Sequence, residues 1–263
     1  MTALSSSSRR ERWIIATALA GVAIAAWAYM IHEARGFTVT GVCECLSMPM
    51  GGGGGWTLAT LLPLFVMWAG MMVAMMLPSA APMILTFAAV SRNRRRLERP
   101  YVPVTIFVAG YVAVWSAFSL LAAIAQWFLH RKALLSPAMA SQSAVLAGLL
   151  LLAAGVFQFT PLKHACLTQC RAPFEFIMTR WREGGGGAFR MGLEHGLFCA
   201  GCCWALMGLL FVAGVMNILW IAALSFVVGL EKLLPRGFWL SSATGVILTG
   251  WGAWMIAGAL HLR

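Results

Sequence analysis

The sequence predicts an all-α polytopic membrane protein, a bundle of about seven transmembrane helices with a cytoplasmic amino terminus and a periplasmic carboxyl terminus. Hydrophobic residues make up 61% of the 263 residues and charged residues only 10%, against about 25% charged residues in soluble domains. Apolar runs of about 20 residues, long enough to cross a bilayer, recur along the chain. Lysine and arginine gather in alternate loops between these runs.

The first apolar run, residues 13–31, follows a segment rich in serine and arginine, residues 1–12, that we interpret as a cytoplasmic tail. A cleaved signal peptide is the competing interpretation, since residues 26–28, Ala-Trp-Ala, have the pattern of a cleavage site. The arginine pair at residues 9 and 10 is faintly similar to a twin-arginine export signal. Because the apolar run continues through residues 26–28 without a break, we predict that 13–31 is transmembrane helix 1.

Residues 32–55 are predicted to form an external loop that captures metal. The loop carries Cys43, Cys45, Met48 and Met50, and it ends in five glycines, a composition typical of a flexible tether. Thiol and thioether sulfur atoms are ligands for soft metals. A strained disulfide between the two cysteines is one alternative, and the absence of either role is the other.

Residues 56–263 are predicted to form a metal-binding membrane domain of six helices. The expected helices are 56–90, 101–129, 143–161, 191–215, 218–234 and 238–260, with a long loop before 191–215. The first of them is longer than a straight span requires and contains Pro78 and Pro82. Because proline has no backbone donor, we expect a kink there and freed carbonyl groups at Ala74 and Pro78.

The positions of lysine and arginine predict the orientation of the chain. The amino-terminal tail and the loops on its side collect fifteen of these residues, and the opposite side collects four. Because basic loops stay in the cytoplasm, we expect an amino terminus in the cytoplasm of a bacterium and localisation in its inner membrane. The same distribution explains the formal net charge of +11 without nucleic acid as a partner.

Helix 191–215 carries the strongest chemical signal. His195, Cys199 and Cys202 fall within roughly 60° of one another around a helix, and Cys203 lies at the edge of the same face. Because polar groups are costly inside a bilayer, these ligands predict one wall of a soft-metal site. Plain packing of small residues is the alternative, and a Gly-x-x-x-Gly spacing that begins at Gly192 indicates a close helix contact.

Two further sets of ligands are expected at the same depth. They are His164, Cys166 and Cys170 after helix 143–161, and Met72, Met75 and Met76 on helix 56–90. Thioethers and thiolates favour Cu(I), whereas thiolates with imidazole also suit zinc, so copper is the expected metal and zinc the second choice. The methionines are equally typical of a packing surface.

Charged residues close to these ligands are expected to have structural roles. Glu194 points away from the metal-binding face, and we expect it to form an ion pair with Arg190 or Lys163. Glu231 and Lys232 are expected to mark the membrane surface.

Four stretches of the chain are distinctive: WAGMMVAMMLPSAAPM (68–83), FQFTPLKHACLTQCRAP (157–173), GAFRMGLEHGLFCAGCCWALM (187–207), and GVMNILW with the Glu-Lys pair at 231 and 232. They resemble a bacterial family of predicted metal-binding integral membrane proteins, the domain of unknown function 2182. The resemblance covers about residues 56–260 and implies metal binding, without fixing the metal, the direction or a reaction. The loop 32–55 lies outside it.

The sequence therefore predicts a protein that binds Cu(I) for copper transport or delivery across the inner membrane. The expected partners are the lipid bilayer and a periplasmic or cytoplasmic copper chaperone, with homo-oligomerisation left open. The chain has no P-loop, dinucleotide fingerprint, metalloprotease helix or nucleophile elbow, so no enzyme activity is expected. The alternatives are a transmembrane thiol–disulfide electron relay and a membrane scaffold or assembly subunit in which the sulfur atoms only pack.

Overall fold

The computed structural model describes residues 2–40, 60–96, 102–132, 134–135, 140–141, 143–234 and 237–261. Within these ranges the protein is helical and has no β-strand, only an isolated bridge between Leu135 and Ser141. The helices are α1 (Thr2–Thr40), α2 (Leu61–Arg96), α3 (Val104–Arg131), α4 (Ala144–Phe157), α5 (Pro161–Arg171), α6 (Pro173–Arg180), α7 (Gly184–Gly208), α8 (Leu210–Ala213), α9 (Ile218–Leu233) and α10 (Gly237–His261). The predicted all-α class is confirmed.

Several of these helices can cross a membrane. Five segments of the described chain are long and apolar enough: Arg12–Arg35, Leu61–Arg94, Val104–Arg131, Gly184–Ala213 and Gly237–Leu260. The pair α4 and α5, bent by 65°, adds a sixth when it counts as one span. Helix α9 has 16 residues, fewer than the about 20 of a typical span. The multi-pass helical class is confirmed, while the count of seven and the sides of the termini stay predictions.

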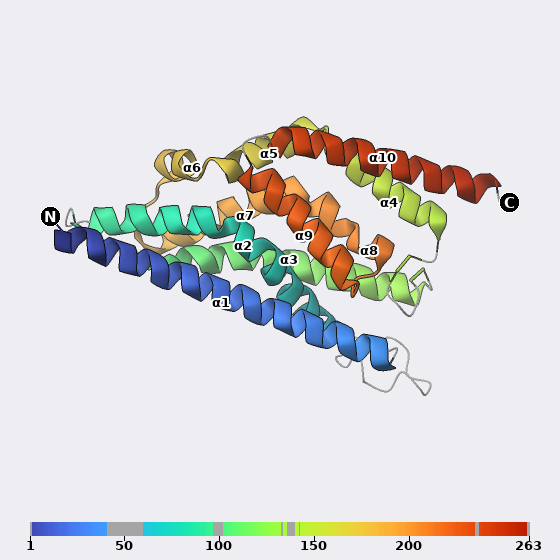
Figure 1. Ribbon diagram of the computed structural model, residues 1–263, viewed down its shortest axis with the longest axis horizontal. Coiled ribbons are helices and arrows are strands. Elements are labelled where there is room, and N and C mark those ends of the chain that lie inside the picture. The colour runs from blue at the N-terminus through green and yellow to red at the C-terminus, as the bar shows by residue number, and fades with distance from the viewer. Residues whose placement is uncertain are drawn as a thin grey trace.

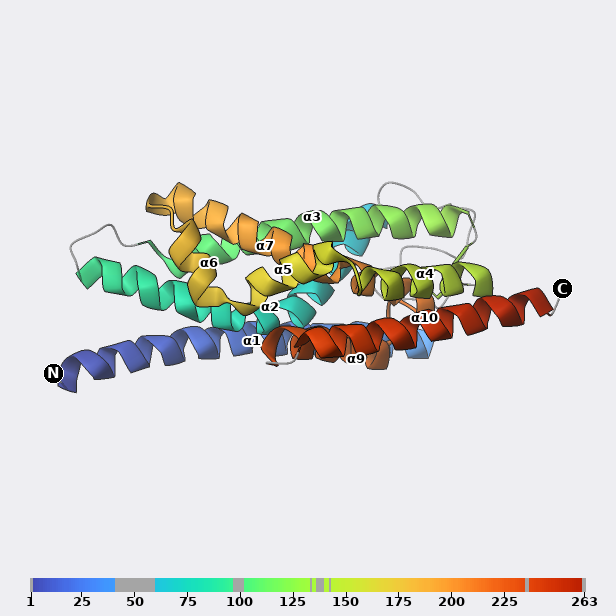
Figure 2. The same ribbon diagram turned by 90° about the horizontal axis from the view of Figure 1, so that it is seen from above.

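The helices run roughly lengthwise, and the two termini lie at opposite ends of the long axis (Figure 1). The carboxyl end of α2, helix α6 and the beginning of α7 lie at the same end as the amino terminus, and the view from above agrees (Figure 2). These segments flank the basic loops that the sequence predicts on one side of the membrane.

The end of α9 and the beginning of α10 lie beside α5, near the middle of the long axis (Figures 1 and 2). Arg171, the last residue of α5, donates from Nη2 to the carbonyl oxygen of Leu234 at 2.6 Å. Its guanidinium also lies over the ring of Phe238, 4.9 Å from the centroid. Helix α9 therefore ends partway along the bundle, at the level where α5 ends.

Helix α1 extends beyond the predicted helix 13–31 at both ends, because residues 2–12 contain neither proline nor glycine to interrupt it. Only 6% of its most apolar window is buried inside the protein, so most of α1 faces outward. The predicted capture residues Cys43, Cys45, Met48 and Met50 lie outside the described residues.

The long loop predicted before residue 191 is wrong, because most of it is helical. Thr160 caps α5 by accepting a hydrogen bond from the backbone of Lys163 at 3.3 Å, and Pro161 follows in the first turn. Helix α6 begins at Pro173, and α7 already begins at Gly184. Proline suits the first turn of a helix, where no backbone donor is needed, and it therefore starts both short helices.

The prolines of α2 change how this helix meets its neighbours. The ribbon of α2 changes direction near its middle (Figure 1), where Pro78 and Pro82 lie. The carbonyl of Ala74, which Pro78 leaves without its helical donor, accepts a hydrogen bond from the indole of Trp27 on α1 at 3.1 Å. The carbonyl that the sequence predicts to be freed is thus used to attach α1 to α2.

The next two carbonyls of α2 also accept side-chain hydrogen bonds. The hydroxyl of Ser225 on α9 donates to the carbonyl of Met75 at 3.4 Å, and that of Tyr111 on α3 donates to the carbonyl of Met76 at 3.2 Å. Helices α1, α3 and α9 therefore all bond to one short stretch of α2.

Helices α3 and α7 approach so closely that only glycine fits between them. A side chain at Gly192 would overlap the carbonyl oxygen of Phe107, and one at Gly110 would lie 2.9 Å from the backbone nitrogen of Leu193. A side chain at Gly196 would meet Val114 at 2.9 Å. The predicted close contact at the Gly-x-x-x-Gly spacing is confirmed, and α3 is its partner.

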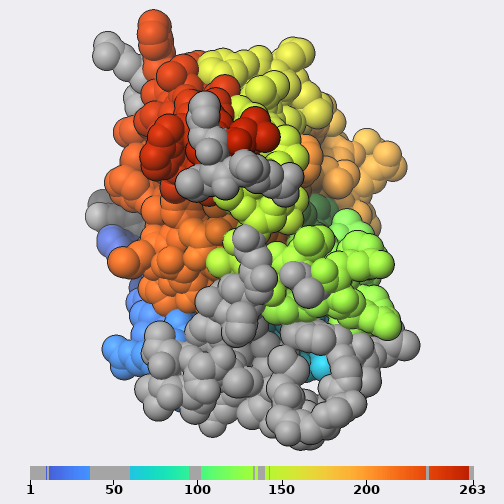
Figure 3. All heavy atoms as spheres, turned by 90° about the vertical axis from the view of Figure 1, so that its right-hand side faces the viewer, coloured from blue at the N-terminus to red at the C-terminus, as the bar shows by residue number. Residues whose placement is uncertain are grey.

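Glycines join α4 and α10 in the same way. A side chain at Gly252 would lie 2.7 Å from the carbonyl oxygen of Gly148, and one at Gly155 would overlap Thr249. The end-on view in Figure 3 shows the atoms of α4 and α10 packed side by side at one edge of the bundle.

Gly192→Ala is expected to destabilise the protein by about 1–3 kcal/mol, because the added methyl group has to push α7 away from α3. The measurement is the melting temperature in detergent. Gly186→Ala is the matched control, since Gly186 lies in the same helix and has nothing within 4 Å of the added atom. Equal melting temperatures for the two variants would contradict the tight contact.

Candidate metal centre

Helix α7 carries three cysteines into the core of the protein. Cys199, Cys202 and Cys203 are each at most 1% exposed, and all three are free thiols. The thiols of Cys202 and Cys203 donate to the carbonyl oxygen of Cys199 at 3.1 and 3.0 Å. These bonds hold the sulfur atoms close to the helix surface and close to one another.

Helix α5 adds a fourth thiol to this group. The thiol of Cys170 interacts with the thiols of Cys199 and Cys202. The thiol of Cys203 reaches the same two residues. We call Cys170, Cys199, Cys202 and Cys203, together with Met76, the sulfur cluster.

Cys166 lies at a different surface of α7. A side chain at Gly201 would come 2.8 Å from the Cys166 sulfur, so this thiol fills the space that Gly201 leaves open. Of the predicted pair on α5, the structure therefore brings only Cys170 into contact with the α7 thiols.

Helix α2 supplies a thioether. The sulfur of Met76 lies 3.9 Å from the sulfur of Cys203. Met72 and Met75, predicted with Met76 as an accessory face, are equally buried in the core. Three helices, α2, α5 and α7, thus contribute sulfur atoms to one cluster, in which Cys170 is half-buried and the other members are buried.

The two predicted histidines lie in aromatic surroundings. The ring of His195 is 5.5 Å from that of Tyr111 and 5.6 Å from that of Phe176, and its Nδ1 has no hydrogen-bond partner in the described part of the chain. His164 stacks on Phe238 of α10 at 5.2 Å. His195 is connected to the sulfur cluster through Tyr111, whose hydroxyl lies 3.2 Å from the Cys199 sulfur.

Lys232 is a member of the site that the sequence reasoning missed. Its Nζ lies 2.9 Å from the sulfur of Cys199, 3.8 Å from that of Met76 and 3.4 Å from the hydroxyl of Ser79. The residue is 6% exposed and its ammonium is enclosed by protein, while the expectation that it marks the membrane surface stays a prediction. A lysine in an otherwise apolar helix was the available signal, because a buried cation needs an electron-rich partner.

Its neighbour Glu231 forms a buried ion pair with Lys163 of α5. The two charged atoms are 2.6 Å apart, and the side chains are 2% and 0% exposed. Glu194 instead contacts Arg180, Arg182 and Arg190 at 3.4–3.5 Å. The expected pair of Glu194 with Arg190 is confirmed, and the alternative partner Lys163 is wrong because Lys163 is held by Glu231.

The donor atoms decide which metals fit. Within the described ranges, no three His, Cys, Asp or Glu side chains are already arranged around a metal position. The sulfur cluster combines thiols with the thioether of Met76, and the ammonium of Lys232 touches it. Such a set, without a carboxylate ligand, fits a soft ion far better than Mg²⁺ or Ca²⁺.

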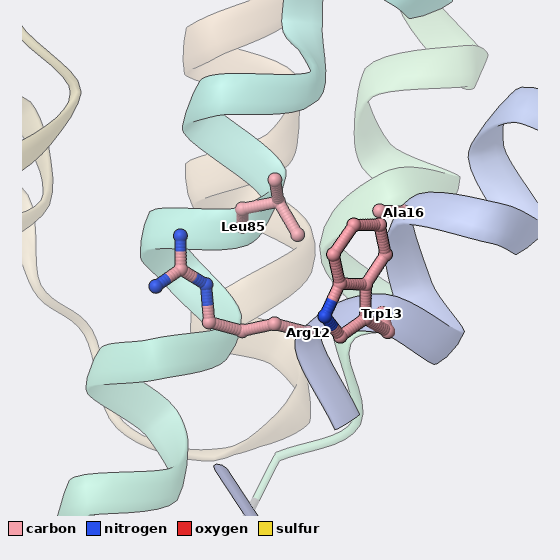
Figure 4. Close-up of a pocket in the computed structure, with 4 residues that line it drawn as sticks. All are labelled: Arg12, Trp13, Ala16 and Leu85. Atoms are coloured by element: carbon pink, nitrogen blue, oxygen red, sulfur yellow. The ribbon is translucent and has the colours of Figure 1, made fainter. Parts of the chain in front are cut away.

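Two pockets lie between α1 and α2. Arg12, Trp13, Ala16 and Leu85 line one of about 340 Å³, and Figure 4 shows the Arg12 side chain extending from α1 across α2. The other pocket shares Arg12 and Leu85 and reaches Leu233, the residue after Lys232. No residue of the sulfur cluster lines either pocket.

Comparison with known proteins gives one match. A family model described as PpoB2, copper chaperone, matches residues 65–255. This stretch contains every residue of the sulfur cluster and Lys232. No curated protein and no solved structure matches the chain. The match supports the link to copper that the sulfur ligands predict, while the identification with domain of unknown function 2182 stays a prediction.

Lys163→Met or Glu231→Leu alone is expected to cost about 3–5 kcal/mol of stability, because each leaves one charge buried without its partner. The double variant removes both charges, and its stability is expected to return most of the way to the wild-type value. Thermal unfolding of the metal-free protein in detergent measures the three values. Additive losses in the double variant would show that the two residues act independently.

Proposed function

The chain belongs to the PpoB2 copper chaperone family, and from this premise we propose that it is a multi-pass protein of the bacterial inner membrane that holds and delivers Cu(I). The observation that carries the proposal is the convergence of buried sulfur atoms from α2 and α7, with the half-buried thiol of Cys170 from α5 packed against them. The family description implies a role other than catalysis, in agreement with the expected absence of enzyme activity.

In this proposal the primary ligands are Cys199, Cys203 and Met76. The sulfur atoms of Cys203 and Met76 are 3.9 Å apart, and Lys232 Nζ contacts the sulfur atoms of Cys199 and Met76. Cys170 and Cys202 are the neighbouring thiols to which the ion can pass, because both lie within reach of Cys199 or Cys203. Thiolates hold Cu(I) tightly and neutral thioethers hold it more weakly, a combination that allows both binding and release. His195, His164 and Cys166 become accessory residues.

The buried methionines of α2 provide a route between the cluster and the far end of that helix. Met67, Met71 and Met75 follow one stripe of α2 at intervals of four residues, and each is at most 1% exposed. The proposed capture residues of the loop 32–55 precede α2 in the chain. We propose that copper moves along this stripe, with the external loop as the donor or acceptor side.

A thiol–disulfide relay is the second candidate, and the contact of Cys170 with Cys199 and Cys202 favours it. Oxidation of two such thiols to a disulfide releases two electrons and two protons to a partner disulfide. The scaffold alternative requires only that the cysteines pack. Trapped mixed disulfides with a partner would support the relay, and unchanged function after replacing all α7 cysteines by alanine would support the scaffold.

Protein purified without oxygen and loaded with Cu(I) is expected to retain near-stoichiometric copper. The double variant Cys199→Ser with Cys203→Ser is expected to lose it, because two of the three primary ligands are removed. Elemental analysis after desalting measures the metal. Copper retention by the double variant would contradict this ligand set, and a wild-type protein without copper or zinc would contradict the proposed function.

Met76→Leu tests the thioether separately and is expected to weaken Cu(I) binding, since leucine keeps the volume and removes the sulfur atom. Met83→Leu is the matched control, because Met83 is also buried in the same helix, lies about two turns from Met76 and does not belong to the methionine stripe. Competition with a coloured Cu(I) chelator gives the two affinities. Equal affinities would remove Met76 from the site.

A further inference from the structure

The charge of Lys232 is not balanced by a carboxylate. In the described part of the chain its Nζ contacts two sulfur atoms and one hydroxyl, those of Cys199, Met76 and Ser79. The adjacent Glu231 is committed to Lys163 at 2.6 Å. The buried ammonium therefore faces the sulfur ligands and not a carboxylate, which makes it part of the electrostatics of the metal site.

We propose that Lys232 is a specificity-determining residue that makes the sulfur cluster select a monovalent soft ion, Cu(I), over divalent ions such as Zn²⁺. This inference rests on the proposed function, because it assumes that the cluster binds metal. The fixed positive charge of Lys232 beside the ligands then favours Cu(I) over Zn²⁺, in addition to the preference of sulfur ligands for soft metals.

Counting charges shows why the lysine distinguishes the two ions. Two thiolates and one Cu(I) leave one negative charge, which the ammonium of Lys232 neutralises. The same two thiolates with Zn²⁺ and Lys232 leave one positive charge in the core, and a net charge is costly there. Zinc reaches neutrality only if a third thiol also ionises.

The repulsion also acts directly on the metal. A metal held by Cys199 and Met76 lies next to the ammonium, because Lys232 Nζ is 2.9 and 3.8 Å from their sulfur atoms. The second charge of a divalent ion adds one more repulsion between unit charges. At about 5 Å and an effective dielectric constant of about 20, that repulsion corresponds to more than about 100-fold in affinity.

The surrounding structure keeps the ammonium in place. Glu231 anchors the end of α9 to α5 through Lys163, and Ser79 on α2 lies 3.4 Å from Nζ on the other side. The lysine therefore stays beside the ligands when the ion binds, as the selection requires.

The test measures the affinities of the purified full-length protein for Cu(I) and for Zn²⁺ by chelator competition in detergent, without oxygen. Lys232→Gln removes the charge and keeps much of the side-chain length. The ratio of the Zn²⁺ to the Cu(I) dissociation constant is expected to fall by more than about 100-fold. Lys232→Arg keeps the charge and is expected to keep a ratio near the wild-type value. Lys132→Gln, which removes an exposed lysine at the end of α3, is the matched control and is expected to change nothing.

Ser79→Asp makes the test independent of the folding of Lys232→Gln. The new carboxylate would pair with Lys232 across the present 3.4 Å contact and neutralise it without removing it. It is expected to shift the ratio in the same direction as Lys232→Gln.

The outcomes separate the two proposals. A lower ratio in both Lys232→Gln and Ser79→Asp, or in Ser79→Asp alone if Lys232→Gln does not fold, supports the selective role. Equal weakening of both metals, or an unchanged ratio, overturns it and leaves the proposed copper binding intact. A wild-type protein that does not bind Cu(I) overturns the proposed function and this inference together.

Discussion

The site depends on one constraint, the missing backbone donor of Pro78. Because the carbonyl of Ala74 has no helical partner, it accepts the indole of Trp27 and attaches α1. The next carbonyls along the same bend accept hydroxyl groups from α9 and from Tyr111 of α3. These hydrogen bonds gather four helices around Met76, and the thioether therefore meets the cysteines of α7 where the bundle is most tightly connected.

The second feature that shapes the site is the pair of adjacent, oppositely charged residues on α9. Glu231 and Lys232 are adjacent, so they point in different directions from the helix, one toward Lys163 on α5 and the other toward the sulfur cluster. The first contact is a neutral ion pair that fixes α9 against α5. The second places a single positive charge beside Cys199. The chain thus separates a structural charge pair from a charge that acts on the ligands.

Sequence periodicity predicts the local features of the structure. It indicates the apolar helices, the cysteine face of α7, the glycine contact at Gly192 and the carbonyl freed at Ala74, because each follows from residues within one or two turns. It misses the contact of Lys232 with Cys199 and the pair of Lys163 with Glu231, whose members lie 33 and 68 positions apart. It also places a loop where α5 and α6 form, since short helices started by proline leave little hydrophobic pattern.

The short helix α9 has a consequence for how the ion is exchanged. With the amino terminus in the cytoplasm, we expect Arg171 and Leu234, whose carbonyl oxygen it bonds, to lie where lipid headgroups begin, because a guanidinium in the hydrocarbon region is costly. Lys232 is two residues before Leu234, so we expect the sulfur cluster just beneath that boundary. A soluble acceptor would then take the ion by ligand exchange at the membrane surface. Only the transfer of the ion between the sulfur cluster and the external side would need a path through the protein.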